Sequence, residues 1–327
     1  MIDRLPLAPA VKGEKATLSE EVLAQIYKLN GPRPLQFIVQ LVFAWLVIFG
    51  IVWWAVWMQS VWATLLAIVV ISTRHNVLGL LVHEQAHRLG FKGKFGDLFV
   101  NLFAAYPLLV LTVEDYAQVH LAHHRDYFTD KDPDFLRKSG PDWSSPMPAS
   151  HLAKLFLMDV CGINTIKLIK GKKESPQGYA FKRPIQIPTW VRPLYFLTIA
   201  SVLVATQTWH LFLLYWLLPI VTISQLIVRW GALCEHKYNL PSASVAESTP
   251  LIVLSWWEKL LLPNLNFAMH PYHHYFPGVA FSNLPKVHKI YAQHGLLNTG
   301  NIYSGYFQYL RSVLARRDSL EAPRQSS

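Results

Sequence analysis

The chain has 327 residues, of which 52% are hydrophobic and only 15% are charged. Soluble proteins carry about 25% charged residues, so the composition argues against an ordinary soluble domain. The formal net charge of +10 fits attraction to anionic lipid head groups. The basic residues form no compact arm and no nucleic-acid-binding motif is present, so we expect no nucleic-acid partner.

The N-terminal segment, residues 1–34, is polar and interrupted by prolines, and we expect it in the cytoplasm. A short surface helix is predicted over Thr17 to Asn30, ending before Pro32. Four of its apolar residues share one face: Leu18, Val22, Ile26 and Leu29. The segment lacks an apolar stretch of the kind that marks a cleaved signal peptide.

Two long stretches contain no charged residue, Pro34 to Thr73 and Pro193 to Val228. Crossing a bilayer once takes about 20 apolar residues, so each stretch predicts a hairpin of two transmembrane helices. The hairpins turn near residues 58–60 and 207–210. The four predicted spans cover about residues 35–55, 58–73, 193–207 and 210–228.

Both predicted turns lack Lys and Arg, whereas basic residues flank the other ends of the hairpins. The positive-inside rule therefore places both termini and residues 74–192 in the cytoplasm. Within that segment, Asp97 to Thr112 predicts a re-entrant or interfacial helix, and residues 125–192 predict a cytoplasmic cap. Leu251 to Leu262 predicts another interfacial helix.

The expected fold is thus an all-α integral membrane protein with one membrane domain, residues 35–317, and a disordered tail, residues 318–327. We expect a bacterial inner membrane or the endoplasmic reticulum. The two cysteines, Cys161 and Cys234, form no C-x-x-C pattern. They are predicted to be free thiols facing a reducing compartment.

Histidines gather in three short boxes, all on the predicted cytoplasmic side of the membrane. The boxes contain eight histidines: His83, His87, His120, His123, His124, His270, His273 and His274. A ninth, His236, follows the fourth predicted span. Residues at i, i+3 and i+4 share one helix face, and imidazole is the commonest metal-ligating side chain. Nine imidazoles exceed the four to six ligands of one metal, so the pattern predicts two metal ions.

Two other classes of protein compete with this interpretation. His83-Glu84-Gln85-Ala86-His87 also matches the H-E-x-x-H motif of zinc proteases. An intramembrane protease would leave six or more clustered histidines unexplained. A metal transporter would place ligands within its spans near the bilayer midplane, but the uncharged stretches are almost free of histidine.

The boxes, in the patterns H-x-x-x-H, H-x-x-H-H and H-x-x-H-H with a single histidine before the third, resemble the membrane fatty acid desaturase and hydroxylase superfamily. The continuations Asp132-Pro133-Asp134 and Tyr275-Phe276-Pro277-Gly278-Val279 resemble its acyl-lipid desaturase branch. The resemblance covers about residues 35–295. It implies a histidine-ligated, non-haem di-iron centre that uses O2 to desaturate a long acyl chain of a lipid or fatty acyl thioester.

The same resemblance leaves a hydroxylase or ketolase outcome open, on a lipid, sphingolipid or carotenoid. No haem-binding His-Pro-Gly-Gly stretch is present, so electrons are expected from a separate donor of the ferredoxin or cytochrome b5 type with its reductase. Carboxylates near the boxes would orient the ligand rings, and the candidates are Glu84, Asp115, Asp126, Asp134 and Glu235. Asn264 and Asn266, just before the third box, are expected to hold a bound water.

Overall fold

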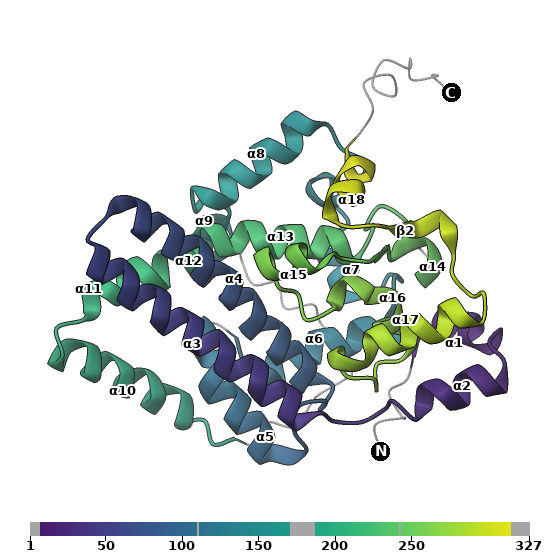
Figure 1. Ribbon diagram of the computed structural model, residues 1–327, viewed down its shortest axis with the longest axis horizontal. Coiled ribbons are helices and arrows are strands. Elements are labelled where there is room, and N and C mark those ends of the chain that lie inside the picture. The colour runs from purple at the N-terminus through teal and green to yellow at the C-terminus, as the bar shows by residue number, and fades with distance from the viewer. Residues whose placement is uncertain (1–6, 110, 171–186, 242, 315–327) are drawn as a thin grey trace.

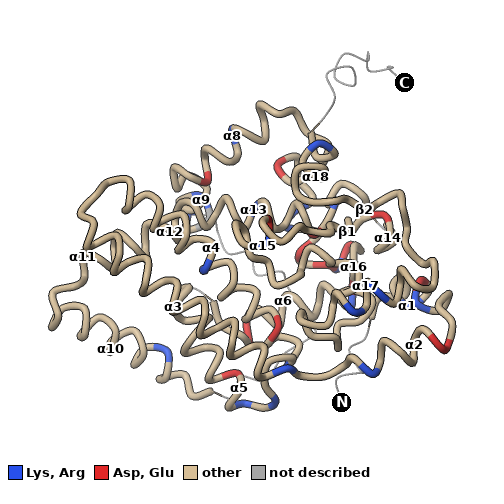
Figure 2. The backbone as a smooth tube through the Cα atoms, in the orientation of Figure 1, with Lys and Arg blue, Asp and Glu red and all other residues tan. Residues whose placement is uncertain are grey.

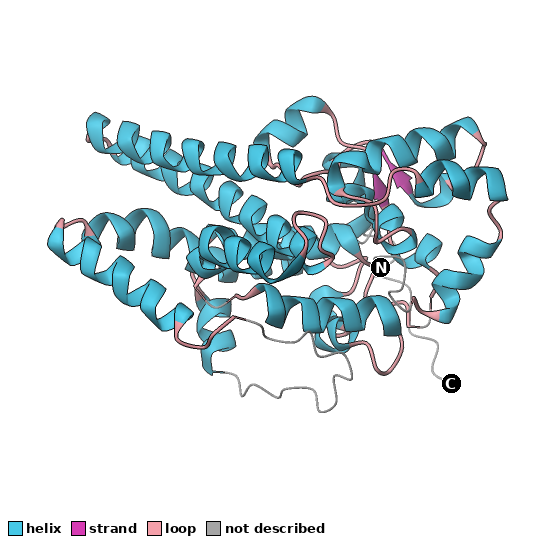
Figure 3. Ribbon diagram, turned by 90° about the horizontal axis from the view of Figure 1, so that it is seen from below, coloured by secondary structure: helices cyan, strands magenta, loops and turns pink. Residues whose placement is uncertain are grey.

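The computed structural model in Figure 1 describes residues 7–109, 111–170, 187–241 and 243–314. Helices account for nearly all regular structure in these residues. The described strands are β1 (Leu251–Ile252) and β2 (Ile302–Tyr303), which pair in parallel and appear in magenta in Figure 3. The predicted all-helical character is therefore correct apart from this short pair.

Three helical segments are long and apolar enough to cross a membrane: α3 (Pro34–Met58), α4 (Val61–Ala86) and Trp209–Glu235. The last is a run of α11 (Trp209–Phe212), a π-helical turn (Leu213–Leu217), α12 (Leu218–Val221) and α13 (Ile223–Glu235). Figure 2 shows that the end of the molecule formed by α3, α11 and α12 carries almost no charged residue. The protein is therefore built to sit in a membrane.

The two predicted hairpin turns are confirmed. Gln59, in the left-handed region at φ 46°, separates α3 from α4, and residues 206–208 separate α10 (Val191–Ala205) from α11. However, α10 has 15 residues, a length of about 22 Å, which is shorter than the roughly 30 Å hydrocarbon core. The four-span topology thus remains a prediction.

A fourth crossing could come from a bent pair of helices. α5 (Gly93–Val100) continues through a π-helical turn (Asn101–Ala105) and a 3₁₀ turn (Tyr106–Leu108), and α6 (Val113–Asp126) then leaves at 90°. Such a pair is either a broken span or a re-entrant loop. This geometry agrees with the re-entrant element predicted over Asp97 to Thr112.

The remaining helices are short and form the cap over α4, α6 and α13 (Figure 1). They are α1 (Pro9–Ala16), α2 (Glu20–Tyr27), α7 (Pro133–Lys138), α8 (Ala149–Val160), α9 (Ile163–Lys170), α14 (Val245–Ser248), α15 (Trp256–Leu261), α16 (His270–Tyr275), α17 (Leu284–Gln293) and α18 (Tyr306–Val313). Short 3₁₀ turns cover Pro141–Trp143, Phe267–Met269, Phe281–Asn283 and Thr299–Asn301.

Two predicted helices need correction. The helix predicted over Thr17 to Asn30 is α2 alone, because the Ser19 side chain accepts a hydrogen bond from the Val22 backbone N–H and begins the helix there. The helix predicted over Leu251 to Leu262 begins only at Trp256, because residues 251–252 pair with β2. The predicted disordered tail lies outside the described residues.

A buried ion pair joins α8 to α13. Arg229 Nε donates to Asp159 Oδ2 at 2.5 Å, and the two side chains are 9% and 2% exposed. Asp159→Ala leaves the guanidinium buried without its partner, which costs about 3–5 kcal/mol. We expect a clearly lower thermal midpoint in detergent. His151→Ala, which removes an exposed contact to Asp142, should change the midpoint little; equal midpoints for Asp159→Ala and wild type would contradict this account.

Candidate metal centre

The fold brings all nine predicted histidines to one place beneath the cap. His83 and His87 lie at the C-terminal end of α4, and the second box lies on α6, which packs along α4. His236 follows directly after α13, which also packs along α4. The third box forms α16. Residues as distant in the sequence as His83 and His274 thus belong to one cluster.

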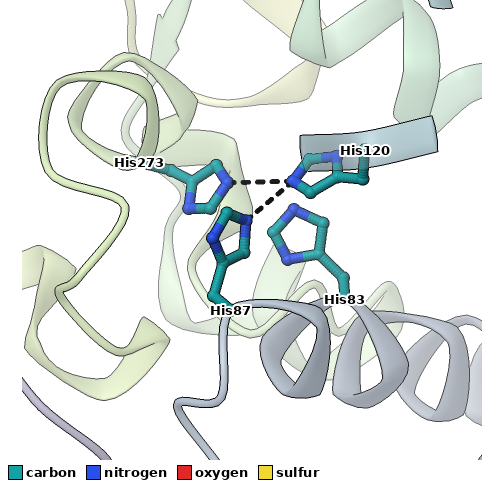
Figure 4. Close-up of side chains that lie close together, drawn as sticks. All are labelled: His83, His87, His120 and His273. Atoms are coloured by element: carbon teal, nitrogen blue, oxygen red, sulfur yellow. Dashed lines mark hydrogen bonds between the residues drawn. The ribbon is translucent and has the colours of Figure 1, made fainter. Parts of the chain in front are cut away.

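Four of the histidines form a first group, shown in Figure 4: His83, His87, His120 and His273. Each offers one ring nitrogen, and these nitrogens all lie within 4.8 Å of one another. His120 Nε2 lies 2.9 Å from His87 Nε2 and 3.4 Å from His273 Nε2. His124 belongs to the same side of the cluster, because its Nε2 lies 2.9 Å from His273 Nε2.

A second group consists of His123, His236 and His274, whose ring nitrogens also lie within 4.8 Å of one another. His270 joins it, with its Nε2 at 3.2 Å from His236 Nε2 and 3.1 Å from His274 Nε2. These contacts divide the nine rings into five and four, and four of the first set and three of the second have ring nitrogens all within 4.8 Å of one another. Each set could therefore hold one metal ion.

Burial favours the protonation state that metal binding needs in most of the rings. It lowers the pKa of His236, His270, His273 and His274 well below the ordinary value, and neighbouring histidines lower it further. Neutral imidazole is the metal-binding form. His123 differs, because burial alone would lower its pKa but the Asp132 carboxylate raises it. In addition, neither ring nitrogen of His83 has a hydrogen-bond partner among the described residues, although the ring is buried. Two groups of buried, converging imidazoles fit two transition-metal ions.

Two rings of the second group have hydrogen-bonding partners at Nδ1, the ring nitrogen that does not face the other rings. His123 Nδ1 lies 2.7 Å from Asp132 Oδ2, a carboxylate with no exposed surface. His236 Nδ1 lies 3.0 Å from Thr249 Oγ1, within hydrogen-bond distance. Partners of this kind fix which nitrogen faces the metal and orient the ring. Sequence reasoning missed both residues, although Asp132 lies in the Asp132-Pro133-Asp134 motif and its position before a proline indicates a helix cap.

The seven polar residues predicted to support the metal site make other hydrogen bonds or lie elsewhere. Asp134 binds Lys138, Arg137 and Tyr238. Asp126 pairs with Arg125, and Asp115 is exposed in the first turn of α6. Glu84 Oε1 accepts the backbone N–H of Phe281 at 3.1 Å.

The other three predicted residues lie around a small cleft or a neighbouring loop. Glu235 and Asn264 line the cleft, and Asn264 also donates to Tyr306. Asn266 donates to the backbone oxygen of Phe281. Hydrogen bonds to histidine rings come from Asp132 and Thr249 instead.

The histidines left outside the boxes lie apart from both groups. His75 contacts Ser224 and Trp216, and His288 bonds to the Tyr272 hydroxyl. His151 contacts Asp142, and His294 contacts Gln25.

Apolar helices long enough to cross a membrane, capped by a double group of buried histidines, define a membrane protein with a histidine-rich metal centre. Residues 59–304, most of the chain, match the Fatty acid desaturase family, and the chain belongs to this family. The chain is also 25% identical over 255 residues to the dihydrorhizobitoxine desaturase of Bradyrhizobium elkanii, an alignment covering 72% of this chain and 69% of that protein. The predicted resemblance is therefore confirmed.

The contribution of the His123–Asp132 contact to metal binding can be tested by substitution. Asp132→Asn keeps the shape of the side chain but removes the charge that holds the ring, and losing such a partner typically weakens metal binding about ten- to a hundredfold. We expect purified Asp132→Asn protein to bind added metal correspondingly more weakly in a titration. Asp126→Asn, which alters a carboxylate paired with Arg125, is the matched control and should bind as wild type does.

Proposed function

We propose that the protein is an O2-dependent desaturase of a long acyl chain, acting at two iron ions held by the nine histidines. The observation that supports this most strongly is the division of the rings into two adjacent groups. A protease using His83 and His87 would need one ion and one further ligand, and its general base would be Glu84, which instead binds the Phe281 backbone.

In this proposal, His83, His87, His120, His124 and His273 hold one iron, and His123, His236, His270 and His274 hold the other. When bound, the irons would supply the O2-dependent oxidation of an unactivated C–H bond. The chain's own contribution is to present neutral imidazoles, to fix two of them through Asp132 and Thr249, and to bury the pair under the cap, where solvent is excluded. A separate ferredoxin- or cytochrome b5-type protein would supply electrons.

A small cleft, about 30 Å³ in volume, adjoins the histidines between α4, α13 and the loop before α16. Phe267 lines this cleft and packs against the ring of His83, with centroids 4.4 Å apart. Leu80, one helical turn before His83, and Gly231 on α13 form other parts of the wall. We propose that the substrate chain reaches the metal centre here, displacing side chains that close the cleft in its absence.

The membrane orientation is part of the proposal. Both hairpins return the chain to its starting side, and the flanking basic residues favour the cytoplasm for that side. The histidine groups would then lie at the cytoplasmic surface, accessible to an electron donor dissolved in the cytoplasm. A lipid or acyl thioester would meet the same site from the membrane.

Elemental analysis of purified protein, combined with lipid profiling of an expressing host, tests the function. We expect about two irons per chain and new double bonds in acyl chains. His236→Ala should abolish these products while the protein still inserts into the membrane, because the apolar helices do not depend on that ring. His288→Ala should retain activity. One zinc without iron in the wild type, or full activity in His236→Ala, would contradict the proposal.

The proposed substrate route has its own test. A side chain added at Gly231 meets no atom within 4 Å, so Gly231→Leu should fold while its side chain fills the cleft. We expect lost or redirected desaturation with an unchanged iron content. Gly50→Leu on α3 adds the same side chain, also with nothing within 4 Å, on an exposed face and should behave as wild type. Unaltered products in Gly231→Leu would exclude this route.

A further inference from the structure

The N-terminal segment precedes the residues that match the family, yet it lies against the metal centre. In Figure 1, α1 lies beside α16, which carries the third histidine box. The backbone N–H of Ala8 donates to the carbonyl oxygen of His124 at 3.1 Å. The N–H of Gly31 donates to the carbonyl oxygen of Gly278 at 2.9 Å, just after the third box. The segment is therefore positioned to influence the histidines.

Glu14, near the end of α1, makes the most concentrated set of these contacts. Its Oε1 accepts the backbone N–H of Val245 at 2.8 Å, and its Oε2 accepts that of Ala246 at 3.1 Å. The Tyr275 hydroxyl also donates to Oε2, at 2.7 Å. One carboxylate thus joins the first turn of α14 to the residue that follows the third box. Hydrogen bonds to a charged acceptor contribute more than neutral ones.

α14 leads directly to the group that holds His236. Thr249 follows the last residue of α14, and its hydroxyl is hydrogen-bonded to His236 Nδ1. The Tyr127 hydroxyl lies 2.6 Å from both Ser248 Oγ and Thr249 Oγ1. A chain of hydrogen bonds therefore runs from Glu14 through α14 to a ring of the second histidine group.

Apolar packing and Glu14 act on different residues of α14. Val245 is buried in an apolar cluster with Ala8 and Val11 of the N-terminal segment. Glu14, Ala246 and Thr249 line a cavity of about 260 Å³. The hydrogen bonds from Glu14 therefore add to the packing of Val245 and hold the part of α14 that borders the cavity.

We propose that Glu14 is a positioning residue for the metal ion of the second histidine group. It fixes α14, and through Thr249 it fixes the orientation of His236, whereas its hydrogen bonds within the described residues reach no residue of the first group. The inference rests on the proposed function only in assuming that both groups bind metal. It predicts that losing Glu14 weakens one site of the two.

Anaerobic titration with Co²⁺, followed by its visible absorption, counts the sites without requiring turnover. Wild type should show two tight sites. Glu14→Ala should keep one of them and weaken the other about ten- to a hundredfold, the effect typical of a lost outer partner. Glu21→Ala is the matched control, because Glu21 is an exposed N-terminal glutamate bonded to Gln25, and it should show both sites unchanged.

Two further variants separate positioning from a general loss of structure. Thr249→Val removes the hydroxyl at the other end of the chain of hydrogen bonds and should weaken the same single site. The double variant Glu14→Ala/Thr249→Val should bind Co²⁺ at this site no more weakly than Thr249→Val alone. The effects of substitutions within one hydrogen-bond network on affinity are not additive. If Glu14→Ala fails to fold, the Co²⁺ sites of Glu14→Gln and Thr249→Val are compared with those of the wild type instead.

Each outcome of the titration has a distinct meaning. Two wild-type sites together with two unchanged sites in Glu14→Ala would overturn this inference and leave the proposed function intact. Equal weakening of both sites, or additive effects of Glu14→Ala and Thr249→Val, would also overturn it, since either indicates loosening of the whole cap. No Co²⁺ binding by the wild type would refute the proposed function itself.

Discussion

The structure depends on holding nine imidazole rings close together with their ring nitrogens facing one another. Nε2 atoms of different rings approach to 2.9–3.4 Å, and most of the rings are almost wholly buried. A neutral imidazole has one donor and one acceptor nitrogen, so a convergent set cannot satisfy every lone pair internally. A cation at each centre resolves this conflict, and the surrounding fold keeps the rings ready for it.

The two groups are held by different means. In the second group, Asp132 and Thr249 fix rings through hydrogen bonds to Nδ1. In the first group, aromatic side chains provide the support: Tyr116 stacks on His120 at 5.4 Å between centroids, and Phe267 meets the edge of His83 at 4.4 Å. Among the described residues, Nδ1 has no hydrogen-bond partner in His124 and His273 of the first group, nor in His270 and His274 of the second. The two groups therefore differ through His123 and His236, the two second-group rings that a carboxylate and a hydroxyl contact.

The sequence predicted the histidines, the apolar hairpins and the family, because each depends on local spacing or composition. It could not assign the rings to groups. His123 and His124 are adjacent, and successive helix residues point about 100° apart, so the two rings reach different groups. The position of α6 along α4, which brings His123 to His236 and His124 to His273, decides which group each ring joins. The role of Thr249 could not be predicted from the sequence either. Its contact with His236 depends on where α14 lies, and the local sequence pattern does not specify the position of α14.

The placement of carboxylates near the rings follows from charge balance. Two divalent cations held by neutral imidazoles would keep their full charge, and an isolated charge is costly in a buried site. Burial alone would raise the pKa of Asp134, but Lys138 and Arg137 bring it well below its usual value, so that carboxylate is already balanced by its own cations. Asp132 contacts the ring of His123 and, apart from that ring, binds backbone N–H groups. Its negative charge is therefore available to offset that of a metal ion, which explains why a fully buried aspartate lies behind a histidine rather than beside a lysine.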